Sequence, residues 1–275
     1  MRFIALTCAV ITLMVAPDAL RAAPGITAPS VTVGRNLQKY ASVRLPEGAP
    51  ESGLQLTLTS DDPSRLLLST APDKAGSATI SLMVRPKFLD SPEFCLYGMA
   101  DSGTVTYTVS AEGIGSAKGT VTLAPSSILI LGPSRVPKFP TTPGGSAAKI
   151  TIVSAALDSS LKVIGEQQVA GGMQLEVTIA SSNPSVGKLG VSKLTLGGGL
   201  STAMTFFQPA AEGDTSITPV QPPGFTAPAE YASVIMAVAK PGLAIVGEIY
   251  LGKDLQTAAV LCLGEAAPPD RKSVV

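Results

Sequence analysis

The chain has 275 residues, 20 Lys+Arg against 20 Asp+Glu, 4% aromatic residues, and neither His nor Trp. The absence of histidine excludes Ser-His-Asp and Cys-His catalytic centres and His-ligated metals. The even charge balance, without a basic stripe, argues against nucleic acid as a partner.

The N-terminal residues follow the three-part pattern of an export signal. Arg2 precedes an uncharged, mostly apolar run over 3–16, and small residues suited to cleavage stand at Ala22 and Ala23. This run is shorter than the roughly 20 residues that a membrane-spanning helix needs. We therefore predict a signal peptide at 1–23, no transmembrane segment after its cleavage, and a secreted or cell-surface location.

Short runs with alternating apolar and polar residues follow one another along the rest of the chain, as at 54–59, 104–111 and 173–179. A period of two places one face of a strand on a core and the other in water. The 27 Gly and 23 Pro gather between these runs, in turn segments such as 61–64 and 182–185. The pattern predicts an all-β chain built from antiparallel sandwiches.

An internal repeat accounts for the length. Residues 33–38 recur at 251–256, so that Gly34 corresponds to Gly252, an offset of 218. Half of this offset is close to the roughly 100 residues of an immunoglobulin-like sandwich. A more diverged middle copy is indicated because 53–59 resembles 172–178 and 108–112 resembles 236–240.

The repeats predict two tandem immunoglobulin-like antiparallel β-sandwiches followed by the truncated start of a third repeat. The expected segments are a signal peptide at 1–23, sandwich 1 at 24–131, a Pro/Gly-rich linker at 132–145, sandwich 2 at 146–250, and the truncated repeat with a disordered tail at 251–275. Four prolines in 132–145 are expected to stiffen the linker. Because two or three strands bury no core alone, we expect 251–263 to pair with sandwich 2 or to fray.

Two motifs resemble those of bacterial Ig-like domains, which form tandem sandwiches in exported proteins. Residues 59–69 and 181–186 resemble the T-S-S-D/N-P-S segment of that family, and 101–107 resembles its D-S-G-x-Y-x-C strand entry. Val105 stands at the tyrosine position of the latter motif and Tyr107 at the cysteine position. The resemblance covers roughly 26–263 and implies spacing, adhesion, or binding of protein or carbohydrate outside the cell.

Candidate chemistry is sparse. Asp61, Asp62 and Asp101 stand in turns of sandwich 1 and are candidate calcium ligands, with solvated turn carboxylates as the alternative. Cys95 and Cys262 remain after signal cleavage and are expected to be buried thiols, with their redox state left open. In the pair Phe206–Phe207 one ring is expected to face inward and the other outward, where it would mark a contact surface.

These observations favour a non-catalytic exported module, a spacer or adhesion-type array without cofactor or catalytic residues. Protein or glycan partners would bind through its loops or strand edges. The alternative is a carbohydrate- or calcium-binding module of an extracellular protein. A carboxylate-dependent hydrolase is the least favoured hypothesis, because no Trp offers a platform for a sugar ring.

Overall fold

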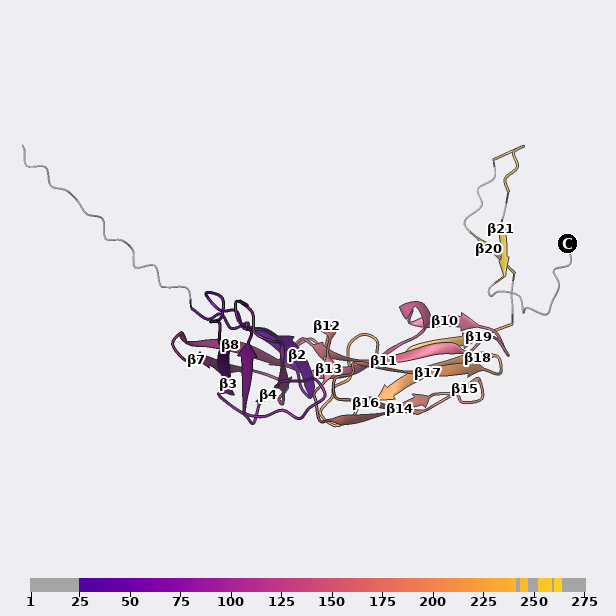
Figure 1. The fold of residues 1–275 in the computed structure, drawn as a ribbon. Coiled ribbons are helices and arrows are strands. Elements are labelled where there is room, and N and C mark those ends of the chain that lie inside the picture. Colours follow the sequence, from indigo (N-terminus) through magenta and orange to yellow (C-terminus); the bar gives the residue numbers. More distant parts are fainter. Residues whose placement is uncertain (1–24, 241–242, 247–251, 259, 264–275) are drawn as a thin grey trace, which may run out of the picture.

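The computed structural model describes residues 25–240, 243–246, 252–258 and 260–263 (Figure 1). The regular secondary structure of these residues is β-strand, apart from one 3-10 helix of three residues. The all-β fold predicted from the sequence is therefore confirmed. None of the described helical segments has the length and apolar character needed to cross a membrane. The predicted signal peptide at 1–23 lies outside the described residues.

The first half consists of strands arranged in two layers. They are β1 (Val31–Gly34), β2 (Leu37–Ala41), β3 (Leu54–Ser60), β4 (Leu66–Ser69), β5 (Thr79–Val84), β6 (Phe94–Gly98), β7 (Thr104–Ala111) and β8 (Gly115–Ala124). One sheet has the order β1-β8-β7-β3-β5, and the facing sheet contains β2-β6-β4. Along β3 and β7 buried and exposed residues alternate as the sequence pattern predicts.

The second half repeats this architecture. Its elements are β9 (Ser126–Leu131), η1 (Pro133–Arg135), β10 (Lys138–Thr141), β11 (Ala148–Leu157), β12 (Val163–Glu166), β13 (Gln168–Val169), β14 (Gln174–Ser181), β15 (Gly187–Leu189), β16 (Lys193–Gly197), β17 (Thr202–Pro209), β18 (Gly213–Val220) and β19 (Val234–Val238). One sheet runs β10-β19-β18-β14-β16, and the other β12-β11-β17-β15 with β9 beside β11. The order of the first of these sheets matches β1-β8-β7-β3-β5 strand for strand.

This correspondence corrects one part of the sequence alignment. Pairing residues 108–112 with 236–240 sets β7 against β19, whereas the sheet orders make β18 the counterpart of β7 and β19 that of β8. Small alternating apolar residues occur on all four strands, so their spacing alone does not identify the strand. Other matches hold in detail: Gly53 and Gly172, aligned in the sequence, both have φ of 76° before β3 and β14.

Each half has its own core. One cluster of buried apolar residues lies wholly between Ile26 and Leu123, and a second lies between Ile128 and Val238, apart from Leu37 of β2. The chain passes from β8 to β9 at Pro125, with no other residue between the two strands. The Pro-rich segment 132–145 contains η1 and β10, and β10 pairs in parallel with β19. That segment therefore forms part of a sheet of the second half.

The C-terminal strands stand apart from both halves. β20 (Leu243–Val246) pairs antiparallel with β21 (Val260–Leu263) in a two-stranded sheet of its own. Among the described strands, β21 thus has β20 as its neighbour and adds no edge to the second sandwich. The expected disordered tail, 266–275, lies outside the described residues.

Candidate functional site

The first predicted metal ligand, Asp61, is held by hydroxyls and an ammonium group. Its carboxylate accepts hydrogen bonds from Thr106 at 2.5 Å, Thr108 at 3.0 Å and the Nζ of Lys118 at 2.9 Å. These hydrogen bonds, first that of Thr106 and then that of Lys118, lower the pKa of Asp61 below its usual value. Its oxygens are therefore already paired with donors from β7 and β8.

The second candidate, Asp62, shapes a turn. Its Oδ1 accepts hydrogen bonds from the backbone N–H of Ser64 at 3.1 Å and from the Ser64 hydroxyl at 2.6 Å. In the second half Asn183 makes the same two contacts with Ser185, at 3.3 and 2.6 Å. Because an uncharged amide performs this role equally well, the turn itself explains the residue at this position.

The third candidate, Asp101, forms an ion pair with Arg35, with 3.7 Å between the charged atoms. Its loop lies beside the Asp62 loop, since Nη2 of Arg65 donates to the carbonyl of Ser102 at 2.6 Å. The structure thus brings the three acidic residues to neighbouring loops but places guanidinium and ammonium groups among them. Within the described residues no group of three or more His, Cys, Asp or Glu is arranged to hold a metal ion.

The two halves meet in a junction at which strands pair with one another. β13 of the second half pairs antiparallel with β2 of the first, with Gln168 opposite Gln38 and Val169 opposite Leu37. The backbone N–H of Ala170 also donates to the carbonyl of Asn36 at 2.9 Å. A single sheet, β13-β2-β6-β4, therefore runs across the junction.

The buried side chain of Gln167 forms hydrogen bonds across the same junction. Gln167 accepts a hydrogen bond from the N–H of Gly34 at 2.9 Å and donates one to the carbonyl of Thr32 at 3.0 Å. The hydroxyl of Ser126 donates to the carbonyl of Arg35 at 2.7 Å. These bonds satisfy backbone groups that the junction removes from water, which would otherwise be costly to bury.

Apolar contacts complete the junction. Leu37 belongs to the first half by sequence, yet it is fully buried in the core of the second half. A smaller cluster joins Cys95 and Tyr97 of β6 to Ala170. Gly171 lies so close to the Tyr97 hydroxyl and the Lys74 carbonyl that a Cβ there finds no room. Tight packing of this kind favours one relative position of the two halves.

Cys95 is a free, buried thiol, as expected from the sequence. Burial, followed by the nearby Glu93 and Asp73 carboxylates, raises the pKa of this thiol to about 11. The protonated thiol is a poor nucleophile at neutral pH, so Cys95 serves packing. The side chain of Cys262 lies outside the described part of the chain.

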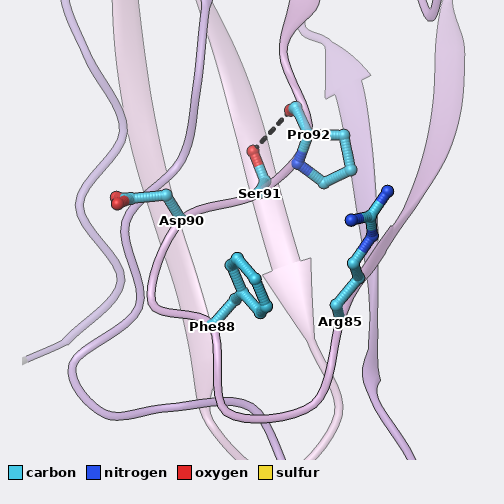
Figure 2. A pocket seen from close by; sticks show the side chains of 5 residues that line it. All are labelled: Arg85, Phe88, Asp90, Ser91 and Pro92. Atoms are coloured by element: carbon cyan, nitrogen blue, oxygen red, sulfur yellow. Dashed lines mark hydrogen bonds between the residues drawn. The ribbon is translucent and has the colours of Figure 1, made fainter.

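A cavity of about 220 Å³ opens in the β5–β6 loop of the first half (Figure 2). It is lined by Arg85, Phe88, Asp90, Ser91 and Pro92. The Asp90 carboxylate points away from the Phe88 ring and pairs with Arg44 at 3.1 Å. The Ser91 hydroxyl donates to the carbonyl of Pro92 and accepts from the N–H of Val43. These polar groups thus stabilise the loop.

Two cavities of about 380 Å³ each flank η1 on the second half and share Leu131, Gly132 and Arg135. Ser134 and Arg135 both have positive φ, 55° and 57°, an unusual conformation for residues other than glycine. On β17, Phe206 is 48% exposed, whereas Phe207 is fully buried. The prediction that one ring of the Phe206–Phe207 pair faces inward and the other outward is therefore confirmed. Separately, η1 and residues of β17 line one of the two cavities.

Sequence reasoning found the turn residues but missed the residues of the junction. Gln167 and Ser126 belong to no motif, and Leu37 fits the pattern of any strand. The repeat of 33–38 at 251–256 was the available signal, because it marks the turn that docks on the second half.

Comparisons with known proteins leave the family open. No family model matches the chain, and no curated protein matches it. Among solved structures, domains 4 and 5 of the S-layer protein SbsC are 16% identical, with a TM-score of 0.32, covering 78% of this chain and 96% of that one. Domains 5-6 of the same protein are 17% identical with a TM-score of 0.28 and the same coverage. The calcium binding domain CBD12 of CALX1.1 is 10% identical with a TM-score of 0.27, covering 71% and 79%. Scores this low assign this chain neither a family nor a function.

Proposed function

We propose that this protein is a non-catalytic, exported structural module whose two immunoglobulin-like sandwiches form one rigid spacer. The observation that carries the proposal is the junction, where β13 pairs with β2 and Gln167 and Leu37 bridge the two halves. Tandem domains joined by small polar contacts move relative to each other by default. A continuous sheet and the burial of Leu37 in the core of the second sandwich oppose that motion.

In this proposal the first sandwich ends at Ala124 and the second begins at Ser126. The rigid unit holds the loops and sheet edges at a set distance from the surface that carries the protein. The export pattern at 1–23 supports a location outside the cytoplasm. We further propose that the module binds protein or glycan through its loops, or acts in adhesion. The cavities beside η1 are the first candidate binding sites.

Distance measurements between two spin labels test the rigidity. Labels are attached at Gln55→Cys and Thr218→Cys, both exposed strand positions, in a background with Cys8→Ser and Cys262→Ser. Cys95 stays, because its buried thiol resists labelling. We expect one narrow distance distribution, which broadens when Gln167→Ala and Ser126→Ala remove the bridging hydrogen bonds.

Gln208→Ala is the matched control, since the Gln208 amide donates to the carbonyl of Gly145 on an exposed surface away from the junction. This variant keeps the narrow distribution. A broad distribution in the unaltered chain means that the two sandwiches move independently, and it overturns the proposal.

A further inference from the structure

The turn between β1 and β2 is reproduced near the C-terminus. Asn36 and Asp254 both have positive φ, 60° and 61°. A Cβ on Gly34 would approach Leu37 Cδ1 to 2.8 Å, and one on Gly252 would approach Leu255 Cδ1 to 2.9 Å. The sequence repeat thus folds into the same local structure, with the leucine in the same position relative to the glycine.

The surroundings of the two leucines differ completely. Leu37 is 0% exposed, in the core of the second sandwich, whereas Leu255 is 72% exposed, the highest value among the large apolar side chains of the described residues. A turn that buries its leucine in a neighbouring sandwich at one site therefore presents it to solvent at the other. The internal junction shows which kind of surface this turn fits.

The β1–β2 turn docks on the end of the second sandwich that contains Val169. The corresponding end of the first sandwich has the same backbone structure. In the second sandwich the N–H of Val169 donates to the carbonyl of Leu200, and the N–H of Gly199 donates to the carbonyl of Val169. In the first sandwich Ala49 makes the same two bonds with Phe88 and Lys87. Gly199 and Lys87 both have positive φ, 84° and 67°. Ala49 is thus the counterpart of Val169, and Phe88 that of Leu200.

Within the part of the chain that the structure describes, nothing covers this end of the first sandwich. Phe88 is 56% exposed, Leu89 is partly exposed, and the cavity of Figure 2 opens beside them. Gly48, the counterpart of Gln168, is exposed, and its peptide groups make no backbone hydrogen bond among the described residues. The equivalent end of the second sandwich is covered by the β1–β2 turn.

We propose that the turn at 252–256 of one copy docks on the Ala49–Phe88 end of a second copy, reproducing the internal junction between chains. Gln256 then pairs with Gly48, and Leu255 lies opposite Ala49 and covers apolar surface at Phe88. Because donor turn and acceptor end are different surfaces, the contact is heterologous and propagates head to tail. This inference rests on the turn and the free end and does not require the rigid-spacer function.

One difference sets the strength of the contact. Ala170 donates its N–H to Asn36 at the internal junction, and its counterpart is Pro50, which has no N–H. Pro50 and Ala170 directly follow Ala49 and Val169, and the segment from there to the aligned Gly53 and Gly172 is one residue longer in the first sandwich. The contact between chains therefore lacks the backbone hydrogen bond that Ala170 makes at the internal junction, and we expect association that depends on concentration.

Sedimentation velocity of the full chain over a range of concentrations tests the proposal. We expect the mean mass of the unaltered chain to rise with concentration. Leu255→Asp places a charge at the centre of the contact and lowers the association constant by roughly tenfold or more. Met83→Asp, which changes an apolar side chain of β5 that is also exposed, leaves association unchanged.

Mixing two variants separates a head-to-tail contact from non-specific association. Leu255→Asp keeps the acceptor end, and Phe88→Asp keeps the turn. Each variant alone stays monomeric, and an equal mixture forms a dimer and no larger species. A monomeric unaltered chain at all concentrations, self-association of Leu255→Asp, or a mixture that stays monomeric overturns the proposal. The spin-label distances within one chain report separately on the spacer function.

Discussion

The two sandwiches share one framework and differ in the segments added to it. In the first, β7 and β8 are joined by a short hairpin, and Tyr107 packs edge-on against Phe94 in a closed core. In the second, the longer connection after β11 carries β12 and β13, and the connection 221–233 contains Phe225, which is buried in the same core as Leu37. The shared strands therefore form the core of each domain. The segments added in the second sandwich supply its contacts with the first.

Leu37→Ala has the largest expected effect, and it tests whether a residue of the first sandwich stabilises the core of the second. Although Leu37 belongs to β2, its loss leaves a cavity in the second core, and we expect the free energy of unfolding to fall by about 2–5 kcal/mol. Urea unfolding measures the loss, and hydrogen exchange locates it at Ile128 and Ile130. The matched change Leu255→Ala, in the same turn but exposed, costs less than about 0.5 kcal/mol in dilute solution. Equal effects of the two changes contradict the assignment of Leu37 to the second core.

Gln167→Ala tests the polar part of the junction. It leaves the buried N–H of Gly34 and the carbonyl of Thr32 without their partner, so we expect a loss of about 1–3 kcal/mol in chemical denaturation. The two sandwiches then unfold in separate transitions if the junction couples them. Gln208→Ala, an exposed amide with one hydrogen bond, is the control and stays within about 1 kcal/mol of the unaltered chain. A similar loss in both variants speaks against a special role for Gln167.

Gly119→Ala tests the close approach of a glycine to an aromatic ring, which occurs on different strands in each sandwich. Gly119 lies directly against the Tyr107 ring, as Gly187 of the second sandwich lies against Phe207, and neither leaves room for a Cβ. We expect alanine at either position to lower the melting temperature, at a cost of about 1–3 kcal/mol. Gly165→Ala, where nothing lies within 4 Å of the added carbon, serves as the control. A stable Gly119→Ala protein shows that the ring moves aside without cost.

The smallest effect is expected for Asp62→Asn, which makes the first sandwich resemble the second. Because Asn183 already makes the same turn contacts, stability changes by less than about 0.5 kcal/mol. Melting curves with and without calcium complete the test. A calcium-dependent rise in melting temperature that Asp62→Asn removes favours the calcium-binding alternative over the structural role of this turn.

The strands and turns of each sandwich were predictable because their signals are local. Alternation at 54–59 and 104–111, and the Asx-Pro-Ser turns at 62–64 and 183–185, need only neighbouring residues. The junction was not predictable in this way. Gln167 meets Gly34 across 133 positions of the chain, and no period or motif marks such a contact. Prolines in 132–145 resembled a linker, but the edge position of β10 tolerates proline, because a missing N–H matters least there.

The parallel pairing of β1 with β8, and of β10 with β19, has a mechanical consequence. Each pair joins an early strand of a sandwich to its last strand, and the two run in the same direction. Tension applied through the chain therefore pulls the partners lengthwise past each other and loads their ladder of hydrogen bonds together. An antiparallel hairpin pulled at its open end loses its bonds one by one. The order of strands thus gives each sandwich resistance to tension along the chain.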